Sequence, residues 1–235
     1  MIRKIYRNIV PQKIREKVRY KIEIDKLRKK SFEKGETFYY FRQTKSIFIH
    51  IPKAGGISII KSLYGENTKG FGHPTYKIFL DLFKEDYYEF FKFTFVRNPW
   101  DRVYSAYTFL TQGGLNEQDR NFFEKYLKEF KTFEDFVLNG LDKEYIKNWI
   151  HFIPQYTFIY DENDRLMVDF VGRFENFEND FNKIANKINS NAKLKHLNKS
   201  KKKKSYVDMY NDKMIEKVYH IYKKDIDLLN YDFGK

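Results

Sequence analysis

The sequence contains no cysteine, which excludes a disulfide scaffold and any metal site built on thiolate ligands. It also lacks an apolar run of the ~18 residues that a membrane-spanning helix requires, and its first residues are too charged for a secretory signal. Acidic residues are outnumbered, with 32 Asp and Glu against 45 Lys and Arg. These features predict an intracellular protein that is soluble or bound peripherally at a membrane surface.

The chain is long enough for a substantial core: its 235 residues suit one domain. Basic charge is concentrated at the start, where residues 1–30 hold 12 Lys and Arg and three acidic residues. Ile14, Val18 and Ile22 recur at every fourth position, a spacing typical of an amphipathic helix. Two interpretations stay open for this segment. It either attaches to an anionic membrane surface or is a solvated helix or tail beside the domain.

Residues 46–60 form the first informative stretch. An apolar run predicts a buried strand, the turn Pro52-Lys53-Ala54-Gly55-Gly56 follows, and an apolar helix begins after it. Glycines let a backbone approach a bound group closely, and N–H groups at a helix start attract anions. Lys53 adds a positive charge and Ser58 adds a hydroxyl. The stretch predicts an oxyanion-binding loop.

The second stretch runs from Lys92 to Tyr107. Phe93 to Val96 predicts another short buried strand, Asn98 is a candidate N-cap, and Pro99 suits the first helical position. Arg97 follows the strand directly, at the edge where ligands bind in open α/β sheets. Ser105 lies two turns into the following helix.

The remaining pattern predicts alternation of helices and short strands. We expect an edge strand or lead-in over residues 37–41, a strand over 168–171 and a mobile basic loop over 193–204. Helices are expected over residues 75–91, 118–130, 132–138, 178–188 and 212–229.

The loop at Lys53 differs from the common nucleoside-triphosphate loop. In that loop the lysine and a Ser or Thr follow the last glycine and serve outer phosphates and magnesium. Here the lysine precedes both glycines, which favours a smaller anion bound without metal. A nucleotide or small-molecule kinase remains an alternative.

Both stretches together resemble the sulfotransferases that use 3′-phosphoadenosine 5′-phosphosulfate (PAPS), especially the carbohydrate branch with heparan-sulfate 2-O- and chondroitin-type enzymes and their bacterial relatives. Later segments agree with the resemblance. They are Gly172-Arg173-Phe174-Glu175, His196-Leu197-Asn198-Lys199-Ser200 and the segment from Asp225 to Phe233. The resemblance covers roughly residues 45 to 235 and leaves the basic N-terminus outside it.

The resemblance implies a P-loop-like, three-layer α/β fold with a central parallel sheet flanked by helices. We expect a basic amphipathic N-terminal segment over residues 1–35 and a sulfotransferase domain over residues 36–235. It implies PAPS as co-substrate, 3′-phosphoadenosine 5′-phosphate (PAP) as product, and no metal. By the family's pattern, Lys53 stabilises the leaving phosphate. The cofactor-binding positions would be Lys53, Ala54, Gly55, Gly56, Ile57, Ser58, Arg97, Ser105, Ser200 and Lys203.

The acceptor side is predicted less fully. Ala54 and Ile57 replace threonines that are common in the family, which predicts weaker cofactor binding. His73 matches the catalytic base of the 2-O-sulfotransferases, and a turn histidine bonded to backbone is the alternative. Arg173 and Gln155 are candidate acceptor contacts, although an ion pair or core packing would explain them equally. His151 is expected to be structural or at the surface.

The expected function is sulfuryl transfer to a carbohydrate hydroxyl of a cell-surface glycan or its precursor. The alternatives are a kinase or a basic module that binds nucleic acid or membrane. The sequence has no recognised nucleic-acid motif, which argues against that partner. The expected location is the cytoplasm, including the inner face of the membrane, and the oligomeric state is left open.

Overall fold

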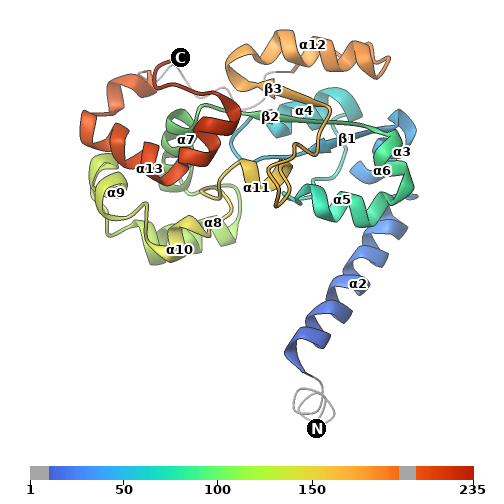
Figure 1. The fold of residues 1–235 in the computed structure, drawn as a ribbon, viewed down its shortest axis with the longest axis horizontal. Coiled ribbons are helices and arrows are strands. Elements are labelled where there is room, and N and C mark those ends of the chain that lie inside the picture. Colours follow the sequence, from blue (N-terminus) through green and yellow to red (C-terminus); the bar gives the residue numbers. More distant parts are fainter. Residues whose placement is uncertain (1–10, 196–204) are drawn as a thin grey trace.

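The computed structural model describes residues 11–195 and 205–235. Three parallel strands form its sheet in the order β1 (Ser46–Ile49), β2 (Phe91–Val96) and β3 (Phe170–Arg173). Ser46 pairs with Phe91, and Phe93 pairs with Phe170. Helices flank the sheet, with α12 and α5 on opposite sides of it in Figure 1, so the predicted α/β fold with a central parallel sheet is confirmed. The carboxyl ends of all three strands meet at one edge.

The helical elements of the described residues follow the chain in this order. They are α2 (Gln12–Lys30), α3 (Thr37–Thr44), α4 (Gly56–Tyr64), α5 (Tyr76–Phe83), α6 (Glu85–Glu89), α7 (Pro99–Thr111), α8 (Glu117–Phe122), the π-helical turn η1 (Phe123–Leu127), α9 (Phe133–Asn139), α10 (Glu144–Lys147), α11 (Tyr156–Ile159), the 3-10 turn η2 (Phe174–Asn176), α12 (Phe177–Lys187), the 3-10 turn η3 (Tyr206–Met209) and α13 (Asp212–Leu229).

The buried apolar residues form two clusters. One surrounds the sheet and draws on α3, α4, α5 and α12. The other joins α7, α8, α9 and α13, which are grouped at the opposite side of the molecule in Figure 1. Helix α7 belongs to the second cluster, and only Arg97 and Asn98 separate it from β2. It therefore connects the sheet to the helical part at the carboxyl edge.

Three element predictions were wrong in detail. The strand expected over residues 37–41 is helix α3, because Phe38 and Phe41, three positions apart, are both buried on one helical face. The helix expected over 75–91 is divided into α5 and α6 at Lys84, which has φ of 52°. The helix expected over 118–130 is α8 followed by the π-helical turn η1.

Side chains cap the starts of α7 and α9, and the predicted Asn98 cap is confirmed. The Asn98 side chain accepts a hydrogen bond from the backbone N–H of Trp100, and Pro99 is the first helical residue of α7. Thr132 caps α9 by accepting from the N–H of Asp135. Asn98 also donates through Nδ2 to the carbonyl oxygens of Asp232 at 2.8 Å and Lys235 at 3.0 Å. The cap of α7 therefore also binds the last residues of the chain.

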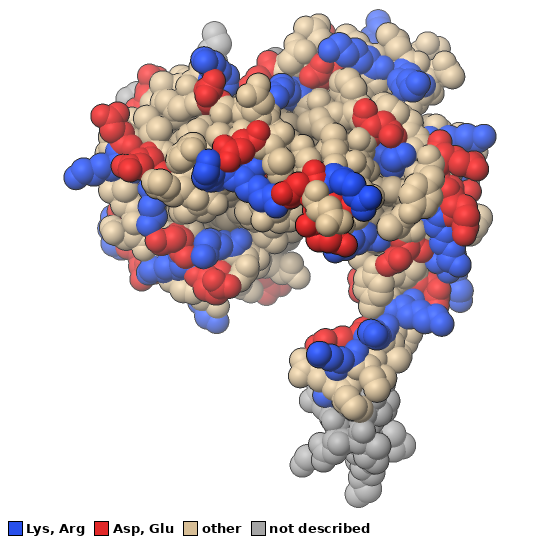
Figure 2. Space-filling view, viewed as in Figure 1, with Lys and Arg blue, Asp and Glu red and all other residues tan. Residues whose placement is uncertain are grey.

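Helix α2 docks on the domain through its second half and projects away from it at the other end (Figure 1). Ile24 is buried, and Arg28 Nη2 donates 2.9 Å to the carbonyl oxygen of Asp81. Basic side chains follow α2 in Figure 2, whereas both signs are mixed over the rest of that face. Among the helices of residues 11–195 and 205–235, none is long and apolar enough to cross a membrane.

Candidate active site

The loop between β1 and α4 has the backbone geometry of an anion cradle. Lys53 and Gly55 have positive φ values of 68° and 83°. A Cβ atom at Gly55 would lie 2.6 Å from the ring of Phe177, and one at Gly56 would lie 2.0 Å from Cδ2 of His50. Side chains at these two positions would collide with packed rings, so the turn needs both glycines. Ala54 and Ser58 are buried, and Ile57 is exposed.

The Lys53 ammonium lies within the protein rather than in solvent. Its Nζ is 3.7 Å from the centre of the Phe109 ring of α7. Burial and the neighbouring positive charge of Arg97 lower the pKa of Lys53 to about 7, although Asp119 acts in the opposite direction. In the described part of the chain Lys53 forms no ion pair. A bound anion would therefore supply the missing counter-charge.

Arg97 connects the two predicted motifs. Its Nη1 donates to the carbonyl oxygen of Lys53 at 3.1 Å, and its Nε pairs with Asp101 at 2.7 Å. The guanidinium group stacks over the Phe174 ring at 4.2 Å. Arg97 thus holds the loop while its half-buried side chain lies at the carboxyl edge of the sheet. Ser105 is half-buried two turns into α7.

Gln155 fixes the backbone of Arg97. Its Oε1 accepts from the Arg97 N–H at 2.9 Å, and its Nε2 donates to the Arg97 carbonyl oxygen at 2.8 Å. The side chain is fully buried. Both polar atoms of its amide group are therefore bonded at the turn between β2 and α7. This arrangement corresponds to the expected alternative of core packing.

Arg102 is a site residue that the sequence reasoning missed. It is 1% exposed, and its guanidinium donates to the carbonyl oxygens of Pro52 at 3.1 Å and Ile153 at 2.8 Å. These bonds fasten the anion loop to the segment before α11. The available signal was an arginine between Trp100 and Val103 on the apolar face of a helix, where a charge needs buried partners.

His73 is oriented by the backbone. Its Nδ1 lies 3.0 Å from the carbonyl oxygen of His50. A carbonyl only accepts, so Nδ1 carries the proton and Nε2 of the neutral ring is left as an acceptor. Burial lowers the pKa of His73, which keeps the ring neutral at physiological pH. The rings of His50 and His73 are 4.2 Å apart.

His151, expected to be structural or at the surface, is buried and lies next to this group. Its Nε2 lies 3.0 Å from Oδ1 of the buried Asp119 on α8. The His151 ring is 6.5 Å from that of His73 and 5.1 Å from that of Phe109. Burial lowers the pKa of His151. A buried Asp–His pair thus lies beside Lys53 and His73, and no sequence spacing indicated it.

Residues 36–232 match the model of the sulfotransferase family. The chain belongs to the sulfotransferase family. Over 100 residues it is 33% identical to an uncharacterized protein of Archaeoglobus fulgidus. That alignment covers 41% of this chain and 65% of the relative, so it spans less than two thirds of the relative. No solved structure matches the chain. Family membership supports sulfuryl transfer as the class of reaction and implies PAPS as donor.

Arg173 and Glu175, from the segment that agrees with the resemblance, bond to other residues of this chain. Arg173 donates through Nη2 to the carbonyl oxygen of Leu229 at 2.6 Å and stacks over the Tyr231 ring at 4.6 Å. Glu175 accepts from the Asn98 N–H at 2.6 Å and from the Tyr231 hydroxyl at 3.1 Å. Both side chains bind the C-terminal segment to the site. Ser200 and Lys203 lie outside the described residues.

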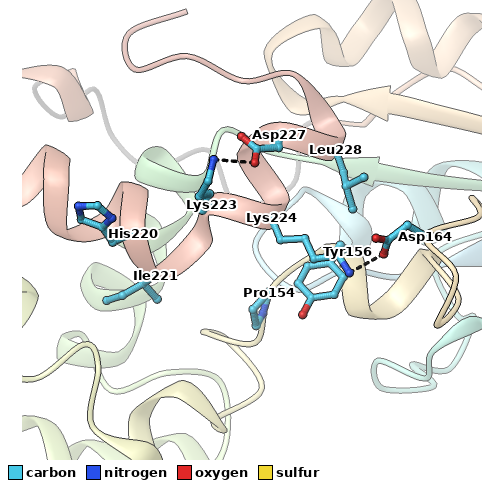
Figure 3. A pocket seen from close by; sticks show the side chains of 9 residues that line it. All are labelled: Pro154, Tyr156, Asp164, His220, Ile221, Lys223, Lys224, Asp227 and Leu228. Atoms are coloured by element: carbon cyan, nitrogen blue, oxygen red, sulfur yellow. Dashed lines mark hydrogen bonds and ion pairs between the residues drawn. The ribbon is translucent and has the colours of Figure 1, made fainter.

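One cavity lies away from this cluster. It measures about 520 Å³ on the outer side of α13, and Figure 3 shows its lining. Lys223 pairs with Asp227 at 2.8 Å and Lys224 pairs with Asp164, so both cations have partners. The residues of the Lys53 loop, His73 and His151 are not part of its lining, and the histidine that lines it is His220. Within the described ranges, His, Asp and Glu form no group of three or more suited to a metal ion.

Proposed function

We propose that this sulfotransferase transfers the sulfuryl group of PAPS to a hydroxyl group of a carbohydrate. The observation that carries the proposal is the Arg97–Lys53 hydrogen bond. It brings the two predicted anion-binding motifs together at the carboxyl edge of the sheet. PAPS has two anionic ends, and two adjacent cationic elements suit them.

Each element receives one end of the donor in this proposal. The loop from Lys53 to Ser58 holds the 5′-phosphosulfate through backbone N–H groups, the lysine and the serine. Arg97 and Ser105 hold the 3′-phosphate, a role that the resemblance also assigns to Ser200 and Lys203, which lie outside the described residues. Arg97 has guanidinium N–H groups beyond those already bonded to Lys53 and Asp101, and the planar fork suits phosphate.

The chain's residues then support an in-line displacement. PAPS supplies the sulfuryl group, whose bond to the bridging phosphate oxygen breaks as a bond forms to the acceptor oxygen. Lys53 stabilises the negative charge that grows on the departing phosphate. His73 accepts the hydroxyl proton at Nε2, the nitrogen left free by its bond to His50.

We further propose that α2 attaches the enzyme to an anionic membrane surface. Nine basic residues occur in Gln12–Lys30, and Ile14, Val18 and Ile22 are 51%, 42% and 50% exposed along one face. An exposed apolar stripe beside basic side chains suits the headgroup region of a bilayer. Membrane attachment would place the enzyme near lipid-linked or cell-surface glycan precursors.

Calorimetric titration with PAP tests the main proposal. The wild-type protein should bind PAP, and Lys53→Ala and Arg97→Ala should each lose at least about tenfold in affinity. Arg165→Ala is the matched control, because Arg165 is exposed and pairs with Asp161 away from the site. Absence of PAP binding by the wild type, or an Arg97→Ala protein that binds as well as Arg165→Ala, would refute the proposal.

The base is tested separately. His73→Ala should lower kcat by about 10²–10⁴-fold while PAP binding is retained. Equal losses of PAP affinity and of activity would instead indicate that His73 supports the loop.

A further inference from the structure

A second cavity of about 300 Å³ lies where α8 and η1 face the segment that leads to His151. Its lining combines three aromatic rings, two amides and one ammonium group: Phe122, Tyr126, Trp149, Gln118, Asn121 and Lys125. Apolar walls with a few polar groups are typical of small-molecule sites.

The lining is produced by helical spacing. Asn121 and Phe122 follow Gln118 by three and four positions, and Lys125 follows them by four and three, so all four residues share one side of the α8–η1 segment. Asp119 lies on a different side, where it bonds to His151. The α8–η1 segment therefore presents one side to the cavity and another to the candidate active site.

The aromatic residues form a firm wall. Trp149 stacks on the buried Phe122 with ring centres 4.1 Å apart and an interplanar angle of 11°. Tyr126 stacks on Tyr145 at 4.6 Å. Flat aromatic rings suit the apolar C–H face of a pyranose. The amide groups of Gln118 and Asn121 suit its hydroxyl groups.

Two polar groups of the wall bear on the choice of ligand. The Trp149 Nε1–H is buried and forms no hydrogen bond. Lys125 is exposed, and its ammonium group contacts the Tyr126 side chain, 4.9 Å from the ring centre. It forms no ion pair among the described residues, whereas Lys128 in the next turn pairs with Glu124 at 2.6 Å. A buried orphan donor costs free energy unless a ligand satisfies it, and an unpaired ammonium group favours a carboxylate.

A chain of ring contacts links the cavity to Lys53. The Trp149 ring lies 6.4 Å from that of His151, which lies 5.1 Å from that of Phe109. Phe109 in turn lies 3.7 Å from the Lys53 ammonium. These short steps cover no more than the length of a few sugar units.

We propose that this cavity is an acceptor subsite that binds one sugar ring of an acidic glycan, one or more units away from the sugar being sulfated. Trp149 and Tyr126 contact the ring, Gln118 and Asn121 bind its hydroxyls, and Lys125 binds a uronate carboxylate. This inference rests on the proposed sulfotransferase function, to which it adds the class of acceptor.

Tryptophan emission tests the subsite directly. The chain has two tryptophans, and Trp100 is 3% exposed with its Nε1 bonded to the Ile215 carbonyl oxygen. We would titrate the full chain with an unsulfated hexasaccharide of alternating glucuronate and N-acetylglucosamine, with and without PAP. The emission should change to saturation in the wild type and in Trp100→Phe, and the change should be lost in Trp149→Phe.

Matched variants test the contacts. By calorimetry, Lys125→Gln should weaken hexasaccharide binding about tenfold, whereas Lys128→Gln should not change it. Uncharged maltohexaose should bind more weakly than the acidic hexasaccharide. All these variants should bind PAP as the wild type does, because none touches the Lys53 loop.

The outcomes separate the two proposals. If the wild type does not bind PAP, the proposed sulfotransferase site is refuted. The saccharide titration without PAP would still show whether the cavity binds the hexasaccharide. If the wild type binds PAP normally, any of three results would refute the subsite alone. These results are no binding of the acidic hexasaccharide, equal effects of Lys125→Gln and Lys128→Gln, or equal affinity for maltohexaose.

Discussion

Nη1 of Arg97 lies 3.1 Å from the carbonyl oxygen of Lys53, so the arginine of one anion-binding element holds the loop of the other. The same guanidinium pairs with Asp101, and the Arg97 backbone is clamped by Gln155. The two elements therefore form one rigid unit. A substitution that disrupts either the Lys53 loop or Arg97 should therefore weaken the binding of both ends of the donor.

Arg97→Lys should lose as much PAP affinity as Arg97→Ala. A lysine is a single point charge and cannot bond to the Lys53 carbonyl, pair with Asp101 and donate to a phosphate in the geometry of a planar fork. Calorimetry with PAP measures the effect. A lysine variant that restores wild-type affinity would show that only the charge of Arg97 matters.

PAP affinity should decrease as pH rises above about 7. Because the pKa of Lys53 is about 7 in the free protein, the side chain is charged below this pH both before and after binding, and affinity stays level. A bound anion raises that pKa, so above pH 7 binding takes up a proton and the association constant falls by up to about tenfold per pH unit. Titrations from about pH 6.5 to about 9 would measure the slope.

Lys53→Arg is the matched control for this pH dependence. Its guanidinium stays protonated throughout the range, so the slope should disappear even if affinity is lower. A slope that persists in Lys53→Arg would assign the titration to another group.

Gly56→Ala should destabilise the fold by about 1–3 kcal/mol, because the new Cβ would lie 2.0 Å from Cδ2 of His50. Gly70→Ala should cost little, since no atom lies within 4 Å of a Cβ built there. Urea unfolding measures both. The double variant His50→Ala with Gly56→Ala should recover part of the loss, and strict additivity would contradict the steric explanation.

Arg102→Met should lower the free energy of unfolding by about 2–5 kcal/mol. The substitution leaves the buried carbonyl groups of Pro52 and Ile153 without their donors. The matched control is Arg120→Met on α8, an exposed site where a change within about 0.5 kcal/mol is expected. Similar midpoints of urea unfolding for the two variants would contradict this role of Arg102.

Vesicle sedimentation should show binding to phosphatidylserine-containing vesicles and not to pure phosphatidylcholine, with binding weakened by salt. Replacing Lys13, Lys17 and Lys21 by Gln should weaken it by about 1 kcal/mol per residue. Replacing Lys128, Lys183 and Lys223 by Gln makes the same charge change on the body of the protein. Equal effects of both triple variants would exclude α2 as the attachment site.

Local sequence signals were sufficient for the elements whose determinants lie close together in the chain. Asn98 and Pro99 specify the start of α7, and the residues of the Lys53 loop form the expected turn between β1 and α4. Helix α3 was misassigned because two aromatic side chains three positions apart also fit a short apolar strand. Only packing against the sheet distinguishes the two.

The parts of the site that the sequence did not predict depend on long-range contacts. Asp119 and His151 are 32 positions apart and meet only because α8 folds back on the segment before α11. The clash that requires glycine at position 56 comes from the His50 ring, whose position is set by its packing against His73. No local pattern encodes these distances.

Asn98 links the start of α7 to residues at the far end of the chain through its bonds to Asp232 and Lys235. Local opening of the terminal segment would remove these bonds and leave the Asn98 amide without its acceptors, beside Arg97. Fraying of the C-terminus and loosening of the proposed 3′-phosphate site should therefore occur as one cooperative event. In hydrogen exchange, PAP would then slow exchange in residues 230–235, although the ligand touches none of them.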